Sequence, residues 1–316
     1  VIETGTARFA VDCGMHQGSD AVERRNLDIA PYDPAHLDFF LLTHAHIDHS
    51  GLLPRMARHG FRGTIYTTEP TADLVKILLL DSAHIQEVEA SGRNKRLLRT
   101  GLKANAVALY TTADAEAVAP LIKTRKYEEM FSPVPGIRVR FQDAGHILGA
   151  AIVELFIEED GSTVKLVFSG DIGRPNQLLI EDPSSVREAD YLFMESTYGN
   201  RNHKGEQESL DELAEAIAYS YANGEKVVIP AFAVERTQEI LYSLHLLLQA
   251  GKLPKDMPVY LDSPLAIKAT EIFHRYRDYL DGATQDILKN GGDPLRLPNL
   301  KMSTSTADSI RINETK

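Results

Sequence analysis

Short apolar runs recur along the first 200 residues at intervals typical of an α/β protein. Such runs, bounded by turn residues, predict buried strands. Longer stretches between them, such as Thr71–Ala90, predict helices that cover a sheet. We therefore predict a layered α/β domain over residues 1–200, with strands at Phe39–Leu42, Ile137–Phe141, Ala151–Ile157 and Leu166–Phe168.

The rest of the chain continues this alternation of helices and strands. The repeated helix–strand order predicts a second parallel α/β unit over residues 201–316. The polar segment Asn200–Gly205 is the expected boundary between the two domains, because the chain has no long linker or low-complexity run. The elements expected in the second unit are a helix from Glu206, a strand at Lys226–Pro230, a helix at Arg236–Ala250 and a strand at Pro258–Leu261.

A dense group of polar side chains follows the first of these strands. His44, His46, Asp48 and His49 lie within six residues, before a predicted helix start at Ser50. We expect them on a tight loop, where imidazole nitrogens suit zinc and a carboxylate suits zinc, manganese or iron. The alternative is a loop that caps a helix through Asp48 or Ser50, but a cap needs only one such residue. The pattern therefore predicts a metal site.

Two further strand ends supply the expected partners of this loop. His146 lies between glycines after one apolar run, and Asp171 follows another run in a Gly-Asp turn. Each alone is typical of an ordinary turn residue. After an explicit metal-binding loop, however, we expect both as ligands. A shared aspartate is the expected bridge between two cations about 3.5–4 Å apart.

Composition agrees with an enzyme of ordinary globular type and limits its surroundings. The 316 residues are 43% hydrophobic and 25% charged, which suffices for two domains with their own cores. No apolar stretch approaches the length of a membrane span, so we expect no membrane partner. The single cysteine, Cys13, excludes an intramolecular disulfide and fits a cytoplasmic location. We expect Cys13 to be a small buried residue rather than a ligand.

The charge of the chain argues against loose binding of nucleic acid, because the formal net charge is −11. Binding in a local cleft remains compatible with it, since bound cations would offset carboxylates at the site. Two basic clusters stand out, one at Arg93–Arg99 with Lys103 and a shorter one at Lys123, Arg125 and Lys126. For both, the alternatives are a solvated surface, which we favour slightly, and a direct contact with RNA.

Taken together, these segments resemble the metallo-β-lactamase superfamily, and within it the β-CASP branch of RNA- and DNA-processing nucleases. The superfamily resemblance depends on Val11–Gly14, the His44–His49 loop, His146 and Asp171, in the family's order. The branch is indicated by Phe193–Gly199, Pro230–Gln238 and Leu261–Leu265. The resemblance implies an αββα sandwich over residues 1–200 with an inserted second α/β (β-CASP) domain over residues 201–316.

The resemblance also implies roles for single residues. His44, His46 and His146 would hold a first metal, Asp48 and His49 a second, and Asp171 would bridge them. Asp12 would orient the histidine loop, and Glu195 would be the acid that assists the leaving oxygen, unless it only begins a helix or turn. The catalytic residues would be Asp48, Asp171 and Glu195, with two divalent metals, zinc first among them, activating a hydroxide nucleophile.

The implied function is hydrolysis of RNA phosphodiesters. Arg236 and Ser263 would contact phosphates near helix N-termini; the alternatives are a surface ion pair for Arg236 and a helix cap for Ser263. Other functions on this fold are a small-molecule hydrolase of thioesterase or lactonase type and a non-catalytic RNA-processing scaffold. A homodimer is among the expectations, whereas RNA versus DNA and endonuclease versus exonuclease stay open.

One departure from the family concerns the later part of the chain. Members close the site with two further histidines downstream of the inserted domain, but no histidine follows His274. The first strand of the fold is also absent before Val1. We therefore expect an incomplete protein that holds its second metal poorly and whose activity is lost or impaired.

Overall fold

The computed structural model describes residues 1–201 and 205–314 and divides the chain into two compact units. Unit 1 comprises Val1–Pro175 and Asp182–Glu195, and unit 2 comprises Asn176–Glu181 and Ser196–Lys316. The predicted boundary segment lies partly outside the description, since residues 202–204 are not among the described ones. In the described part of the chain, no helix combines the length and the apolar character that a membrane crossing requires.

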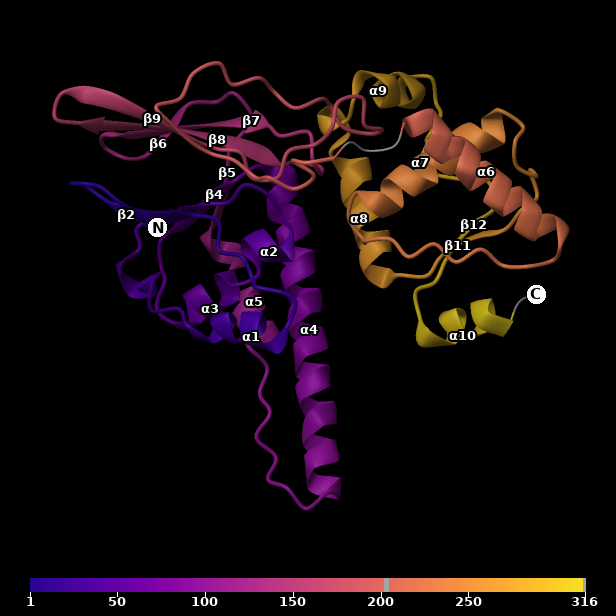
Figure 1. Cartoon of the computed structure of the whole chain (residues 1–316), viewed down its shortest axis with the longest axis horizontal. Helices are drawn as coiled ribbons and strands as arrows, with labels where there is room; N and C mark the ends of the chain where they lie inside the picture. Colours follow the sequence, from indigo (N-terminus) through magenta and orange to yellow (C-terminus); the bar gives the residue numbers. More distant parts are fainter. Residues whose placement is uncertain (202–204, 315–316) are drawn as a thin grey trace. The chain divides into compact units, whose positions relative to one another are not determined.

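Unit 1 contains two five-stranded sheets (Figure 1). In the first sheet β2 to β5 run parallel, and β1 pairs antiparallel at the edge. In the second sheet β6 to β9 are antiparallel neighbours, and β10 is parallel to β9. The first sheet is β1 (Ile2–Glu3), β2 (Arg8–Val11), β3 (Phe39–Leu41), β4 (Thr64–Thr67) and β5 (Ile122–Thr124). The second is β6 (Phe131–Val134), β7 (Ile137–Asp143), β8 (Ala151–Glu159), β9 (Ser162–Phe168) and β10 (Tyr191–Phe193).

The two sheets pack face to face through one apolar core. Phe9 and Phe39 of the first sheet stack with ring centroids 4.4 Å apart, and they share a buried cluster with Phe141 and Leu155 of the second sheet. Alternation along β7 and β8 directs every second side chain into this core. The predicted α/β sandwich is therefore confirmed, and the four strands predicted in this unit all form.

Helices cover the outer face of the first sheet (Figure 1). The longest, α4, begins after Thr68, whose side chain accepts the Thr71 N–H, and has Pro70 in its first turn. It extends to Arg99, well beyond the predicted end at Ala90. The helices of this unit are α1 (Asp20–Glu23), α2 (Ile47–Ser50), α3 (Leu53–Arg58), α4 (Glu69–Arg99) and α5 (Thr112–Glu116), with 3₁₀ turns at Arg24–Leu27, Pro34–His36 and Ala119–Leu121.

Unit 2 alternates helices with two short strands that pair in parallel. Leu261 packs with Ala266 and Ile267 in a small core cluster. This second α/β unit was predicted, as were its helices from Glu206 and Arg236. Its elements are α6 (Glu206–Ala222), α7 (Arg236–Gln249), β11 (Val259–Leu261), α8 (Pro264–Arg275), a 3₁₀ turn at Arg277–Tyr279, α9 (Gly282–Lys289), β12 (Leu300–Met302) and α10 (Thr306–Glu314).

The strand predicted at Lys226–Pro230 is wrong. This segment has no regular secondary structure, and its Val228 side chain is 84% exposed. An apolar run forms a strand only where a neighbouring strand satisfies its N–H and C=O groups. Within the described residues no strand pairs with this segment.

Candidate metal centre

The predicted ligands follow the carboxyl ends of strands that point the same way. In the first sheet β2 and β3 are parallel, and Asp12 and His44 follow them. In the second sheet β7 and β9 both run antiparallel to β8, so they share a direction, and β10 joins them. His146, Asp171 and Glu195 come after these three strands. Parallel ends of two facing sheets thus bring together residues that are far apart in the sequence.

The His44–His49 segment differs from the predicted loop. His46 is the N-cap of α2, and Asp48 and His49 lie inside that short helix. Backbone hydrogen bonds from the segment that follows β2 hold this helix in place. The Cys13 N–H donates to the His49 carbonyl at 2.7 Å, and the Met15 N–H donates to the Ile47 carbonyl at 2.9 Å. A Cβ on Gly14 would lie 1.5 Å from the Asp48 carbonyl oxygen, so only glycine permits this approach.

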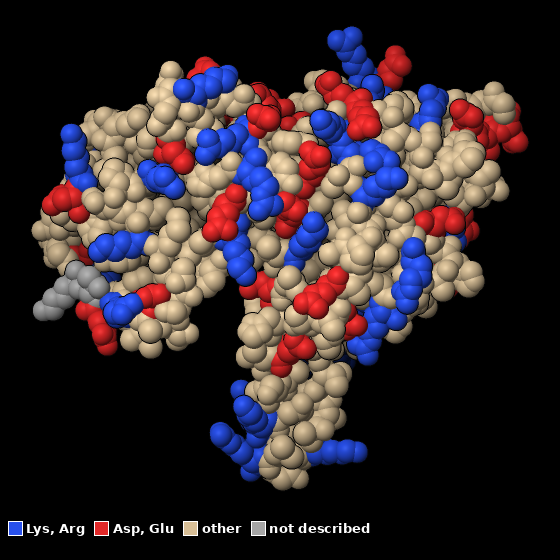
Figure 2. Space-filling view, turned by 180° about the vertical axis from the view of Figure 1, so that it is seen from behind, with Lys and Arg blue, Asp and Glu red and all other residues tan. Residues whose placement is uncertain are grey.

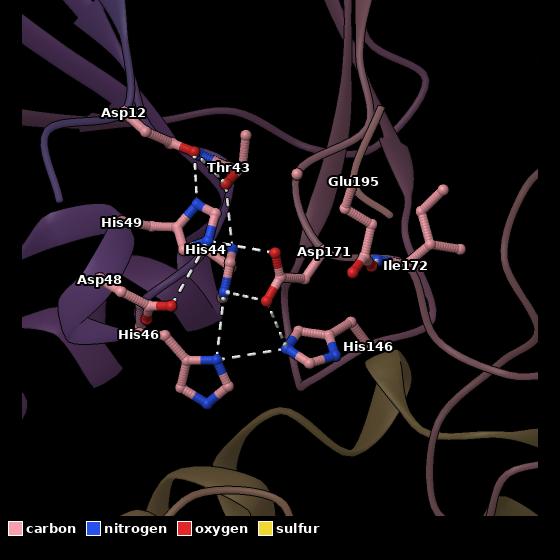
Figure 3. A network of polar contacts seen from close by, with 12 residues as sticks. Asp12, Thr43, His44, His46, Asp48, His49, His146, Asp171, Ile172 and Glu195 are labelled. Carbon is pink, nitrogen blue, oxygen red and sulfur yellow. Dashed lines mark hydrogen bonds and ion pairs between the residues drawn. The ribbon is translucent and has the colours of Figure 1, made fainter. Parts of the chain in front are cut away.

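A first ligand group is formed by three histidines and one carboxylate (Figure 3). His46 Nδ1 lies 3.1 Å from His44 Nε2 and 3.2 Å from His146 Nε2. Asp171 Oδ2 lies 3.8 Å from His44 Nε2 and 3.6 Å from His146 Nε2. The four ligand atoms lie within 4.8 Å of one another, which fits the His and Asp ligands of a tetrahedral zinc site.

A second ligand group shares Asp171 with the first. Asp171 Oδ1 lies 3.1 Å from His49 Nε2, and Asp48 Oδ2 lies 3.9 Å from the same nitrogen. The two oxygens of Asp171 therefore face different groups (Figure 3). This second group offers three protein ligands, and the Asp48 side chain is 61% exposed. The residues present thus fit two divalent cations, the first held by more ligands than the second.

Asp12 fixes histidines of both groups without belonging to either. Its Oδ2 accepts the Nδ1–H of His49 at 2.7 Å and the hydroxyl of Thr43 at 2.8 Å. The Thr43 oxygen in turn lies 3.0 Å from His44 Nδ1 and accepts its hydrogen. Both rings therefore carry their proton on Nδ1 and direct Nε2 toward the ligand groups. The backbone of Asp12, at φ 56°, lies in the left-handed region that permits this placement.

Burial and neighbouring charges set the protonation of these side chains. Burial lowers the pKa of His44 well below its usual value, lowers that of His46 to about 4 and also lowers that of His146. Three neutral imidazoles are therefore available to a cation at neutral pH. For His49 burial acts in the same direction, but the hydrogen bonds to Asp12 and Asp171 outweigh it and raise its pKa to about 10.

Asp171 and Glu195 lie on adjacent turns of the second sheet. Burial would raise the pKa of Asp171, but the hydrogen bond and charge of His49 outweigh it and lower the pKa. Glu195 Oε1 accepts the Ile172 N–H at 2.5 Å, and the Glu195 N–H donates to Ser169 Oγ at 3.1 Å. These two hydrogen bonds connect Glu195 to the turn that carries Asp171. Its contacts are therefore those of a carboxylate that stabilises a turn after β10.

The two residues predicted to contact phosphate, Arg236 and Ser263, lie in unit 2. Their observed contacts are those of the alternative interpretations, a surface ion pair for Arg236 and a helix cap for Ser263. Ser263 caps α8, its hydroxyl accepting the Ala266 N–H at 3.2 Å. Arg236 opens α7 and pairs with Glu239 at 2.8 Å, with its side chain 59% exposed. Their contact with phosphate stays a prediction. Cys13 is fully buried, as predicted.

Thr43 was missed in the sequence. It joins Asp12 to His44, yet a threonine beside a histidine has no distinctive spacing. The only available signal is its position, one residue before the first ligand and after a buried strand.

Two family models match the chain. Residues 1–171 match the Metallo-beta-lactamase superfamily domain. Residues 237–316 match the Beta-Casp domain. The first match alone covers more than half of the chain.

Curated relatives match over almost the whole chain. Ribonuclease TTHA0252 of Thermus thermophilus is 34% identical over 309 residues, which cover 98% of this chain and 65% of the relative. An RNase J-like protein of Methanocaldococcus jannaschii is 31% identical, covering 93% and 61%. Transcription termination factor FttA of Methanosarcina mazei is 31% identical, covering 92% and 44%. The chain therefore spans less than two thirds of the length of these relatives.

Proposed function

The chain belongs to the metallo-β-lactamase superfamily, and from this premise we propose that it forms the metal-binding part of a two-metal phosphodiester hydrolase that acts on RNA. The observation that carries the proposal is the position of Asp171. Its two carboxylate oxygens face two ligand groups, one with three histidines and one with Asp48 and His49. A carboxylate shared in this way is the usual bridge of a two-metal hydrolase.

The chemistry follows from this arrangement. Two divalent cations held here would acidify water to supply hydroxide near neutral pH and would offset charge on the phosphate oxygens. The side chains around the site have two effects on the ligand histidines: they keep the ligand nitrogens deprotonated, and they orient these nitrogens toward the metal positions. Burial achieves the first for His44, His46 and His146, and the Asp12–Thr43 pair achieves the second for His44 and His49.

Glu195 is our candidate for the proton donor to the leaving oxygen. It is anchored to the Asp171 turn through the Ile172 N–H, so it is held at a fixed distance from the bridging carboxylate. A positioned carboxylic acid contributes about 10²–10⁴-fold to such a reaction.

RNA is the proposed substrate because relatives named Ribonuclease TTHA0252 and RNase J-like protein match nearly the whole chain. The Beta-Casp match favours a polymer substrate over the thioesters or lactones of small-molecule hydrolases on this fold. The six converging ligand residues argue against a non-catalytic scaffold, since a scaffold has no need of them. Arg236 and Ser263 stay our candidates for phosphate contacts.

The finer assignments are proposals as well. Zinc is the proposed metal because the ligand set is rich in histidine. The proposed location is the cytoplasm, which the buried, unpaired Cys13 supports. A homodimer stays a prediction that a measurement of mass in solution would test.

The deciding experiment combines metal analysis with an activity panel. The full-length protein that contains this chain is loaded with metal and incubated with labelled RNA, labelled DNA and a set of thioesters, with and without a chelator. We expect RNA cleavage that the chelator abolishes and that added zinc restores. Turnover of thioesters without cleavage of RNA would instead establish the small-molecule hydrolase, and absence of all turnover with both metals bound would establish the scaffold.

A further inference from the structure

The second half of α4 extends away from the body of unit 1 (Figure 1). The last buried residue of this helix is Ala83, and none of the residues from His84 to Arg99 is buried. Sixteen helical residues span about 24 Å. We call residues 84–109, which comprise this half-helix and the segment that returns along it, the basic arm.

The outer part of the arm, from residue 90 onward, carries positive charge without any carboxylate. No Asp or Glu occurs between Glu89 and Asp114 in a chain whose net charge is −11. Figure 2 shows blue side chains gathered at the tip without red ones among them. Across the described residues, no ion pair joins these cations to a carboxylate. The cations are Arg93, Lys95, Arg96, Arg99 and Lys103.

The cations of the helix lie on one side, and the other side is held by the return segment. The Asn94 amide donates to the Ala106 carbonyl at 2.7 Å and accepts the Ala106 N–H at 2.8 Å. About two turns nearer the body of unit 1, Gln86 Oε1 accepts the Leu109 N–H at 3.1 Å, so the return segment is bonded to the helix at a second level. At about 100° per residue, the four helical cations fall within about 160°, centred opposite Asn94. The return segment thus supports the helix on the side of Asn94, and the opposite side of the helix carries the cations.

Helix stability does not explain this distribution. Cations in the last turn, here Arg96 and Arg99, are stabilised by the helix dipole. Arg93 and Lys95 lie earlier, and of these only Arg93 has a carboxylate, Glu89, four residues before it. Like charges three or four residues apart, such as Lys95 and Arg99, destabilise a helix by about 0.2–0.5 kcal/mol per pair. A helix that needed only solubility would alternate cations with carboxylates. A bound polyanion would relieve the repulsion.

We propose that the basic arm binds the phosphate backbone of RNA at a distance from the metal centre. The proposal rests on the proposed function and adds an anchoring site to it. The first turn of α4 is tied to the His146 loop, where Thr68 and Thr71 hydroxyls donate to the Gly149 carbonyl at 2.6 and 2.8 Å. The arm forms the opposite end of the same 31-residue helix, about 46 Å away.

This separation sets the length of RNA that can use the arm. At a stacked spacing of about 3.4 Å per nucleotide, roughly thirteen nucleotides would reach from the metal centre to the tip. A membrane surface fits the arm less well, because a helix lying on a bilayer needs a broad apolar face. Here the side opposite the cations is occupied by the return segment through Asn94.

The test removes the charge of the arm and varies the length of the RNA. The arm variant is Arg93→Gln, Lys95→Gln, Arg96→Gln and Arg99→Gln, because glutamine keeps the helix propensity. A matched control replaces four exposed cations outside the arm, Arg24, Arg187, Lys255 and Lys268, by glutamine. A third variant replaces the three arginines of the arm by lysine and so keeps its charge. Binding is measured in an Asp171→Asn background, and circular dichroism checks the helix content.

For a 25-nucleotide RNA we expect the arm variant to bind on the order of 10–100-fold more weakly. We also expect a salt dependence of log K shallower by about 2, as for loss of roughly three phosphate contacts on a single strand. Binding of a six-nucleotide RNA should not change, and the control and lysine variants should bind both RNAs like the parent.

Hydrolysis of bis(p-nitrophenyl) phosphate, measured with the full-length parent and its arm variant, both with native Asp171, separates this proposal from the proposed function. This small diester needs only the metal centre, so its turnover should equal that of the parent. If the parent cleaves neither the diester nor RNA, the proposed function fails, while the length-dependent binding still decides the role of the arm. Equal loss of binding for both RNA lengths, or no loss for either, would overturn the proposal. So would an arm that binds phosphatidylserine vesicles more tightly than the long RNA.

Discussion

Asp12 and His49 are joined by a 2.7 Å hydrogen bond from Nδ1 to Oδ2, although 37 positions separate them in the sequence. The same Asp12 oxygen accepts the Thr43 hydroxyl, which orients His44. A single carboxylate that belongs to neither ligand group therefore sets the tautomer of one histidine in each. Loss of such an outer partner typically costs about 10–100-fold in metal affinity.

Replacement of Asp12 by Asn should weaken both metal sites by about 10–100-fold, because an amide cannot accept hydrogens from His49 and Thr43 at one oxygen with the same strength. Competition with a chromogenic chelator measures both affinities. Asp38→Asn is a matched control in the same unit, since among the described residues its carboxylate accepts just the backbone N–H of Arg8. An unchanged affinity at the His49 group would contradict the orienting role.

Replacement of Asp171 by Asn should remove hydrolysis and reduce the bound metal while the fold persists. A neutral amide offers neither the charge nor the two equivalent oxygens that face the two groups. Turnover should fall by more than the loss of about 10–100-fold that is typical when an outer partner of a ligand is replaced. Turnover, metal content and circular dichroism are measured together. Asp190→Asn is the control, because in the part of the chain that the structure describes its carboxylate accepts just the Lys165 N–H. Near-normal turnover with two metals bound would refute the bridge.

The two metal sites should differ in affinity and in proton release. The first group has four ligand residues and neutral histidines, whereas the second has three, including His49 with its pKa raised to about 10. A cation at the second group must displace the His49 proton, so its affinity should rise with pH up to about 10. We expect this 316-residue chain to retain close to one zinc at pH 7 and to approach two at pH 9.

Calorimetry in two buffers of different ionisation enthalpy would check this difference. The first zinc should release almost no proton at pH 7, and the second about one. His49→Gln should abolish the second event and leave the first nearly intact. If two zinc ions bind with equal affinity and neither releases a proton, the proton on His49 does not determine the affinity for the second zinc.

The strand pattern could be predicted because it depends on local sequence, whereas the grouping of the ligand residues could be expected only from their repeated place after strands. An apolar strand followed by polar residues is visible in the chain, and parallel strand ends converge by topology. The predicted helix at Thr71–Ala90 ended too early, because the polar residues up to Arg99 have no apolar stripe to pack. Their helix continues as the arm, where propensity and the Asn94–Ala106 bonds replace burial.

Other features depend on contacts that the sequence does not display. Asp48 and His49 enter a helix because backbone bonds from Cys13 and Met15 fix that turn, and no side-chain pattern reports such bonds. The strand predicted at Lys226–Pro230 had the right composition but found no partner strand in the described chain. Composition can therefore indicate which segments favour a strand, but pairing decides which of them become one.

Replacement of Glu195 by Gln should lower turnover of RNA by about 10²–10⁴-fold and leave the metal content unchanged, if Glu195 donates the proton. Glutamine still accepts the Ile172 N–H, so the turn keeps its geometry. A substrate whose leaving group needs no proton, such as a p-nitrophenyl diester, should lose much less. Equal losses on both substrates would indicate that Glu195 only supports the Asp171 turn.

A last prediction concerns stability and Glu154, a carboxylate on β8 that is 2% exposed. Burial alone would raise its pKa, but hydrogen bonds from Arg140 at 2.7 Å, Lys165 at 2.6 Å and Gln142 at 3.1 Å outweigh burial and lower the pKa to about 2. Its ordinary pKa is 4.5. The ionised group therefore stabilises the fold fully above about pH 4.5, and this contribution is lost as the pH falls toward 2.

Glu154→Gln should accordingly lower the free energy of unfolding by about 2 kcal/mol at pH 7 and by much less at pH 3. Urea unfolding of the metal-free protein at both values measures the difference. Glu158→Gln is the matched control, because Glu158 lies on the same strand with its side chain 59% exposed and a 3.8 Å pair to Arg138. A pair of that kind contributes little, so the control should change stability by less than about 1 kcal/mol at either pH. An equal loss at pH 7 and pH 3 for Glu154→Gln would show that packing, rather than the charge, is what this side chain contributes.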